Sequence, residues 1–98
     1  MAKFGMNLLL WTTDLQESQF GLLDDMKKIG YDGVELPIFN LDVANFKKIG
    51  TRCDAVGLGR TAVTVSTPDA NPIDASSTVR EAAVTRLKQV LDCCAAAG

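Results

Sequence analysis

Short apolar runs alternate along the chain with longer segments in which apolar residues recur at helical spacing. The short runs predict three β-strands, over Phe4–Trp11, Asp32–Leu36 and Arg60–Ser66. The helical spacing predicts three amphipathic helices, over Leu15–Ile29, Val43–Val56 and Thr78–Gly98. Each strand is therefore expected to lead into a helix.

The apolar positions of each predicted helix define the face that we expect to be buried. They are Leu15, Phe20, Leu23, Met26 and Ile29 in the first helix, Val43, Phe46, Ile49, Cys53 and Val56 in the second, and Ala83, Val84, Leu87, Val90, Leu91 and Cys94 in the third. The predicted N-terminal cap is Asp14 for the first helix and Asn40 or Asp42 for the second. For the third helix, Thr78 and Glu81 have the spacing of a capping box. Gly30 and Gly57 are the expected helix stops.

The alternation of strands and helices indicates parallel strands joined by right-handed crossovers. Such units occur in doubly wound sheets and in (β/α)8 barrels. Nucleotide-binding doubly wound folds normally carry a glycine-rich turn after the first strand, but the segment Trp11–Gln16 has no glycine. The only Gly-x-Gly, at Gly57–Gly59, precedes a strand. Phosphate binding on that plan is not supported, whereas a barrel of about 250 residues would contain this chain as roughly three-eighths of its length.

The composition is typical of a globular protein and argues against several function classes. Of the 98 residues, 47% are apolar and 22% charged, and the formal net charge is -2. Nucleic-acid binders carry a basic stripe and membrane-surface proteins a polybasic segment, so neither kind of partner is expected. The longest apolar run is too short to cross a bilayer, and the N-terminus lacks the features of a signal peptide. These features predict a cytoplasmic protein.

Three cysteines and the absence of histidine narrow the chemistry further. Cys53, Cys93 and Cys94 are odd in number and two are adjacent, which predicts reduced thiols used for packing. Without histidine, the chain lacks the commonest metal ligand and the commonest general base at neutral pH.

A single carboxylate, Glu35, interrupts the apolar second strand. In barrels, the carboxyl ends of the strands face the active site, and those positions here are Asn7–Trp11, Glu35–Ile38 and Thr64–Thr67. At a strand end, Glu35 could reach water, substrate or a cation, whereas an unpartnered carboxylate inside the wall would be costly. The alternative is that Glu35 binds backbone amides or a neighbouring basic residue and only braces the strand ends.

Three stretches of the sequence resemble the N-terminal part of xylose-isomerase-like (sugar-phosphate isomerase/epimerase) barrels, and among these the ketose 3-epimerases acting on tagatose or psicose. They are FGMNLLLWTTD, KKIGYDGVEL and NPIDASSTVREAAVTRLKQVLDCCAAAG. The second is common to many members of the superfamily, and the first and third favour the 3-epimerases. The resemblance implies an α/β fold in which residues 1–98 form the N-terminal βαβαβα part, three βα units, of a parallel TIM barrel.

The resemblance also implies a chemistry for a longer parent protein. Members interconvert ketoses by removing a proton next to the carbonyl, using two glutamates and a divalent metal, Mn, Co or Mg, that stabilises the enediolate. In the family these groups lie on the fourth strand and beyond. We therefore expect this fragment to hold no catalytic residue and no metal ligand, and to be inactive by itself.

The first three strands could still supply part of a substrate-binding wall for the ketose. The resemblance and the strand-end positions nominate five residues: Asn7, Trp11, Glu35, Thr64 and Ser66. Asn7 stands where several 3-epimerases have an aromatic residue, which leaves the particular sugar open. Trp11 could cover an apolar sugar face or simply pack at the barrel top, and the strand-end hydroxyls could be capping groups.

A piece of a barrel exposes strand edges and apolar faces, which invite association. The expected partners are the missing remainder of the barrel or further copies of the chain. Two functions stay open: a portion of a sugar isomerase or epimerase, and a non-catalytic α/β unit that self-associates through exposed strand edges.

Overall fold

Three parallel strands form one sheet in the order in which they occur along the chain. A computed structural model describes all of residues 1–98 and contains β1 (Gly5–Asn7), β2 (Gly33–Pro37) and β3 (Gly59–Val63). Strand β2 lies between β1 and β3 and pairs in parallel with both. The predicted parallel βα arrangement is confirmed, and β1 and β3 are the two edges of the sheet.

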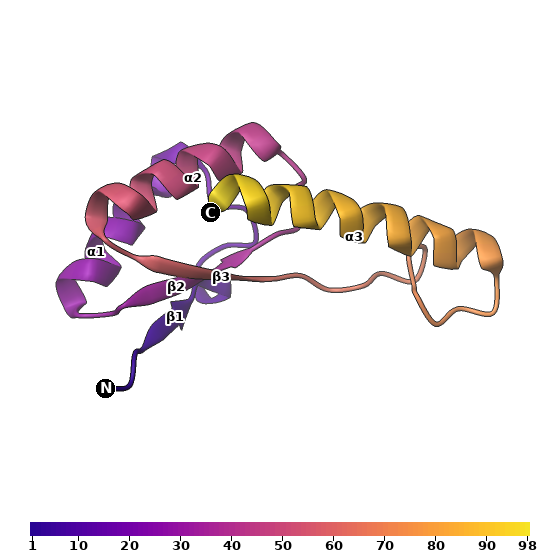
Figure 1. Cartoon of the computed structure of the whole chain (residues 1–98), viewed down its shortest axis with the longest axis horizontal. Coiled ribbons are helices and arrows are strands. Elements are labelled where there is room, and N and C mark those ends of the chain that lie inside the picture. The colour runs from indigo at the N-terminus through magenta and orange to yellow at the C-terminus, as the bar shows by residue number, and fades with distance from the viewer.

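Helices follow each strand and cover one face of the sheet. They are α1 (Gly21–Ile29), α2 (Val43–Val56) and α3 (Ser77–Ala97), with short 3-10 helices η1 (Leu8–Leu10) and η2 (Glu17–Gln19) between β1 and α1. Figure 1 shows α1 and α2 on the same side of the strands, and α3 lying along α2 and projecting well beyond it. The molecule is consequently elongated, with extents of 47 × 28 × 22 Å.

Several predicted element ends are confirmed and others are wrong. Gly30 and Gly57 end α1 and α2 in the left-handed conformation, with φ of 115° and 80°. Asp42 caps α2 by accepting a hydrogen bond from the amide of Asn45. The first strand, predicted to reach Trp11, ends instead at Asn7, because the chain turns there into η1.

Two predicted caps do not form. Asp14 does not cap α1, which begins only at Gly21; its carboxylate accepts hydrogen bonds from the side chains of Gln16 and Asn40 instead. The capping box of Thr78 is also absent, because α3 starts one residue earlier, at Ser77.

The core lies between the sheet and the helices. Fifteen buried residues form one cluster, which includes Val34 and Leu36 of β2 together with Phe46, Ile49 and Cys53 of α2. Most of the predicted inner face of α1 is buried, but Ile29 is exposed because it lies in the last turn, away from the sheet. Val43, predicted to be buried in α2, is also exposed, since it is the first residue of the helix.

One arginine fastens the end of α3 to the rest of the molecule. The guanidinium of Arg60, which leaves β3 on the helix side, donates to the carbonyl oxygens of Ala97 and Leu58 and to the carboxylate of Asp54. Because carbonyls at a helix C-terminus lack partners within the helix, this contact stabilises the last turn of α3.

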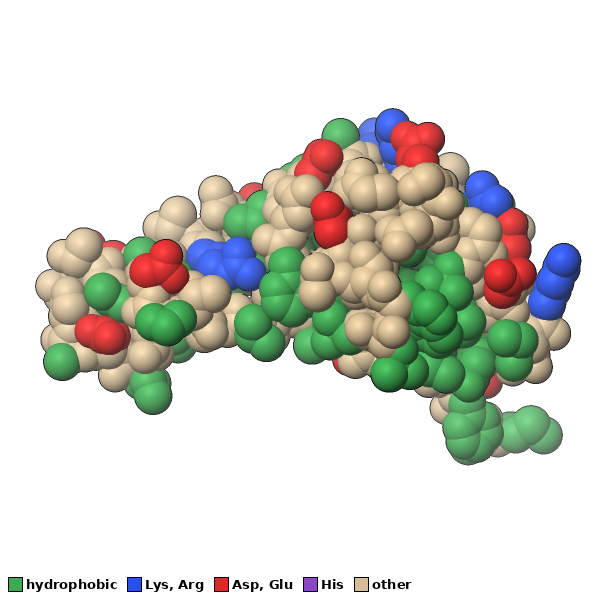
Figure 2. All heavy atoms as spheres, turned by 180° about the vertical axis from the view of Figure 1, so that it is seen from behind, with side chains coloured by type: hydrophobic (Ala, Val, Ile, Leu, Met, Phe, Trp, Pro, Cys, Tyr) green, Lys and Arg blue, Asp and Glu red, His purple; other side chains and the backbone are tan.

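Helix α3 leaves an apolar stripe uncovered. Its buried residues Ala83, Val90, Cys93 and Ala97 were only partly predicted, whereas Val84, Leu87 and Leu91, predicted to be buried, are exposed. Figure 2 shows a further continuous apolar area on the broad end of the molecule, away from the projecting end of α3. Exposed apolar areas can mark contact surfaces with other molecules.

Candidate functional site

The three strands share one short pattern, Gly-x-polar. It reads Gly5-Met6-Asn7 in β1, Gly33-Val34-Glu35 in β2 and Gly59-Arg60-Thr61 in β3. The register aligns the three glycines in one row across the sheet and the three polar residues in the next, since Asn7 pairs with Glu35 and Glu35 with Thr61. Residues two apart along a strand point to the same face, so both rows face away from the helices.

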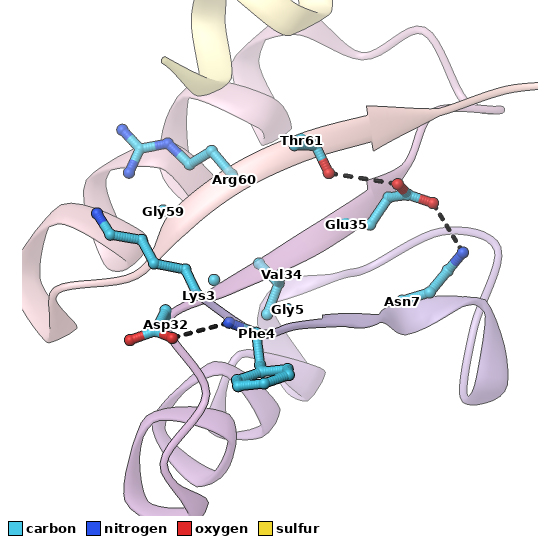
Figure 3. A pocket seen from close by; sticks show the side chains of 11 residues that line it. Lys3, Phe4, Gly5, Asn7, Asp32, Val34, Glu35, Gly59, Arg60 and Thr61 are labelled. Atoms are coloured by element: carbon cyan, nitrogen blue, oxygen red, sulfur yellow. Dashed lines mark hydrogen bonds between the residues drawn. The ribbon is translucent and has the colours of Figure 1, made fainter. Parts of the chain in front are cut away.

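The polar row is joined by hydrogen bonds centred on Glu35. Asn7 Nδ2 donates to Glu35 Oε1 at 2.8 Å, and Thr61 Oγ1 donates to Glu35 Oε2 at 3.3 Å. Figure 3 shows the three side chains lying in a line across the open face of the sheet. Glu35 is therefore braced on both sides by neutral donors from the neighbouring strands. The partners are side chains, and not the backbone amides or the basic residue that the bracing alternative predicted.

A hollow of about 400 Å³ lies on this face beside the polar row. The glycine row leaves its floor free of side chains, and Lys3 and Asp32 contribute charged groups to its lining. The amide of Phe4 donates to Asp32 Oδ2 at 2.8 Å, which closes the amino end of the hollow. The hollow therefore combines an open backbone surface with one end lined by charged groups and another by an amide, a carboxylate and a hydroxyl.

The polar row has acceptor sites that a ligand could use. A carboxylate has about four acceptor sites, so Glu35 keeps lone pairs for a ligand hydroxyl while bound to Asn7 and Thr61. No group of three or more His, Cys, Asp or Glu side chains in the structure could hold a metal ion. Burial raises the pKa of the thiols of Cys53 and Cys93, which opposes formation of a nucleophilic thiolate.

The structure brings together two of the five nominated residues. Asn7 and Glu35 are in contact, whereas Trp11 follows η1 and lines a separate hollow at the start of α1 together with Gln19 and Leu22. Thr64 lies just beyond β3, where its hydroxyl accepts a hydrogen bond from Arg86 of α3 at 3.1 Å. Ser66 is exposed in the loop that leads to α3.

Thr61 completes the polar row and was missed by sequence reasoning. The third strand was extended to Ser66, so its functional end was sought at Thr64 and Ser66, beyond the actual end of β3 at Val63. The recurring Gly-x-polar pattern could have found it, because GMN, GVE and GRT place one polar residue at the same step of each strand.

Comparison with solved structures identifies the class of fold. The chain superposes over 100% of its length on a protein assigned as a sugar phosphate isomerase/epimerase from Anabaena variabilis, with a TM-score of 0.85 and 20% identity. It superposes over 98% of its length on D-psicose 3-epimerase crystallised with D-fructose (TM-score 0.85, 18% identity). L-ribulose 3-epimerase is matched over 100% of the chain (TM-score 0.82, 22% identity).

The match covers only part of each of these proteins. The chain spans 35%, 34% and 33% of their lengths, respectively. No protein-family model and no curated protein matches the sequence. The fold is that of three consecutive βα units of a TIM barrel, as the resemblance seen in the sequence implies.

None of the helices combines the length and apolar character that crossing a bilayer requires.

Proposed function

We propose that residues 1–98 are the N-terminal portion of a metal-dependent barrel enzyme that interconverts ketose sugars by proton abstraction next to the carbonyl. The observation that carries this proposal is the superposition of the whole chain on about a third of three proteins named as sugar isomerases or epimerases. At 18–22% identity, this likeness concerns the backbone, so the substrate class rests on the names of these proteins and on the polar row.

Within such an enzyme, these residues supply part of the sugar-binding wall. Asn7 and Glu35 present an amide and a carboxylate on the open face of the sheet, where sugar hydroxyls could exchange hydrogen bonds with them. The partly exposed indole of Trp11 could cover an apolar sugar face. Thr64 and Ser66 remain predicted contacts at the start of the loop after β3.

The catalytic base and the divalent cation, Mn, Co or Mg, would come from residues outside this chain. The donors present do not form a site of three ligands, and they include no histidine. We therefore derive no catalytic step through a metal held by these 98 residues, and we expect the chain by itself to be inactive.

A sugar-conversion assay tests the proposal. The chain alone, and a longer protein extended through its own coding sequence beyond Gly98, would be incubated with D-fructose and Mn²⁺, Co²⁺ or Mg²⁺. We expect epimerised ketose from the longer protein and none from the chain alone. A longer protein that binds no ketose and converts none, with any of the three metals, would refute the proposed function.

A second candidate function is a non-catalytic unit that assembles with copies of itself. It is favoured by the exposed apolar stripe of α3, Val84, Leu87 and Leu91, and by the unpaired edge of β3. Strand β1 also has one unpaired edge. We propose that β1 of a second copy pairs in parallel with the free edge of β3 and so continues the sheet.

Sedimentation at micromolar concentration tests the assembly. Self-association is expected for the chain and should weaken in Leu87→Lys, which places a charge in the exposed stripe without touching the core. A compact, stable monomer would contradict this second function and leave the first unaffected.

A further inference from the structure

The row of Asn7, Glu35 and Thr61 is connected to the turn that carries Trp11. Asn7 uses both ends of its amide: Nδ2 donates to Glu35 Oε1 at 2.8 Å, and Oδ1 accepts from the amide of Leu9 at 2.9 Å. The first contact joins β1 to β2, and the second caps η1. One side chain therefore links the carboxylate in β2 to the segment that follows β1.

The chemistry of the carboxylate fixes which way the amide points. An ionised carboxylate only accepts hydrogen bonds, whereas the amide of asparagine has a donor end and an acceptor end. Only the NH₂ group of Asn7 can face Glu35, and the carbonyl oxygen then faces the backbone of Leu9. A side chain without an acceptor at position 35 would leave the amide free to rotate.

The oriented carbonyl explains why the first strand stops at Asn7. The apolar run continues through Trp11, and sequence alone predicts a strand that long. Instead, the contact from Leu9 begins a 3-10 turn, in which the amides of Trp11 and Thr12 donate to the carbonyl of Leu8 at 3.0 and 3.1 Å. This turn places Trp11 against the start of α1, with its side chain 48% exposed.

We propose that Glu35 is a positioning residue: through Asn7 it sets the turn after β1 and thereby the place of the Trp11 indole. This answers why an apolar strand carries an acid. Only the role of Trp11 in covering a sugar rests on the proposed function. The positioning of Trp11 by Glu35 does not depend on any sugar.

Trp11 is the single tryptophan of the chain, so its fluorescence reports this turn alone. In Glu35→Leu, we expect the emission to shift to longer wavelength and quenching by acrylamide to rise about twofold, as the side chain goes from 48% exposed towards full exposure. The near-ultraviolet circular dichroism of the indole should weaken. Far-ultraviolet circular dichroism shows whether the variant is folded.

Two matched variants separate positioning from a general effect of altering the open face. In Glu35→Gln, Oε1 still accepts from Asn7 and Nε2 can donate to Thr61, so the Trp11 signals should match those of the unaltered chain. Thr61→Val removes the other hydrogen bond of Glu35 and leaves Asn7 in place, so it should have the same outcome.

If Glu35→Leu fails to fold, exchanging the amide and the carboxylate between positions 7 and 35 provides a second test. Asn7→Asp places two carboxylates face to face and should displace Trp11 as Glu35→Leu does. In the double variant with Glu35→Gln and Asn7→Asp, the amide at position 35 can donate to the carboxylate at position 7. The Trp11 emission should then return to that of the unaltered chain. The proposal is overturned if Asn7→Asp leaves Trp11 unchanged, if the double variant fails to restore it, or if a folded Glu35→Leu keeps the original spectrum.

A titration of the longer protein with D-fructose separates the two proposals. If D-fructose leaves the Trp11 fluorescence unchanged while the variants at positions 7 and 35 shift the emission as expected, the result counts against the proposed function alone. A sugar response that persists in Glu35→Leu with an unmoved indole would count against the positioning role alone.

Discussion

Neighbouring residues of β2 point to opposite faces of the sheet and meet opposite surroundings. Leu36, 1% exposed, packs among the helices in the core, whereas Glu35 faces the open side and is held only by two side-chain hydrogen bonds. The same division holds in β3, where Arg60 reaches the helix layer and Thr61 the polar row. The helix face carries the apolar burial that stabilises the fold, and the open face carries the polar groups that could meet a ligand.

Glycines serve different purposes on the two faces. On the helix side, the backbones of α2 and α3 come so near at Gly50 that an added Cβ would lie 2.6 Å from the carbonyl oxygen of Ala97. On the open side, the glycine row leaves a hollow. Substitutions on the two faces should therefore differ in what they disturb, which is stability on one and the position of Trp11 or ligand binding on the other.

The largest expected effect comes from the helix face of β2. Leu36→Ala removes a fully buried side chain, and such changes cost about 2–5 kcal/mol of unfolding free energy. Thr61→Ala, on the open face, should change it by no more than about 0.5 kcal/mol, as surface substitutions usually do. Urea unfolding followed by far-ultraviolet circular dichroism compares the two. Similar losses in both variants would mean that the two faces are not distinct in stability.

A smaller loss is expected where the two helices touch. Gly50→Ala should destabilise the fold by about 1–3 kcal/mol, because the new Cβ meets backbone that cannot yield easily. This opposes the gain of about 1 kcal/mol that alanine normally brings to a helix. Gly21→Ala in α1 is the matched control, since nothing lies within 4 Å of its added Cβ. If Gly50→Ala were as stable as Gly21→Ala, α3 would not pack on α2 at this point.

Most of the architecture follows from local patterns in the sequence. The spacing of apolar residues placed the helices, and Gly30 and Gly57 marked where α1 and α2 end, because these signals depend on a few neighbouring residues. The exposed stripe of α3 could not be predicted this way. Val84, Leu87 and Leu91 have the spacing of a buried face but are exposed, and apolar spacing alone does not tell whether a neighbour covers such a face.

The candidate site was predictable only in part, for a similar reason. Asn7 and Glu35 were nominated from strand position and family resemblance, and they do meet. Their meeting with Thr61 depends on register between strands far apart in sequence, which apolar periodicity does not determine. The turn at Asn7 depends likewise on a carboxylate 28 positions away, so the apolar run through Trp11 favoured a longer strand.

The smallest expected effect lies at the surface of the helix layer, between α1 and α2. Arg52 makes two hydrogen bonds to the carboxylate of Asp24, at 3.0 and 2.7 Å. The pair is partly exposed, so it should contribute little to stability. The hydrogen bonds from Arg52 and, behind them, its charge and that of Lys28 still hold the pKa of Asp24 below its ordinary value.

Carboxyl-carbon NMR titration of Asp24 measures this contact directly. Arg52→Gln should raise the pKa of Asp24 towards its ordinary value, and Lys28→Gln should raise it less, because Lys28 acts only through its charge at longer range. A lowered pKa in the folded state means that the ion pair stabilises the fold above the unfolded pKa and that this contribution is lost as pH falls through the folded pKa. The stability difference between the unaltered chain and Arg52→Gln should therefore close in acid. If the difference persists there, it reflects lost packing of the arginine stem and not the charge of the pair.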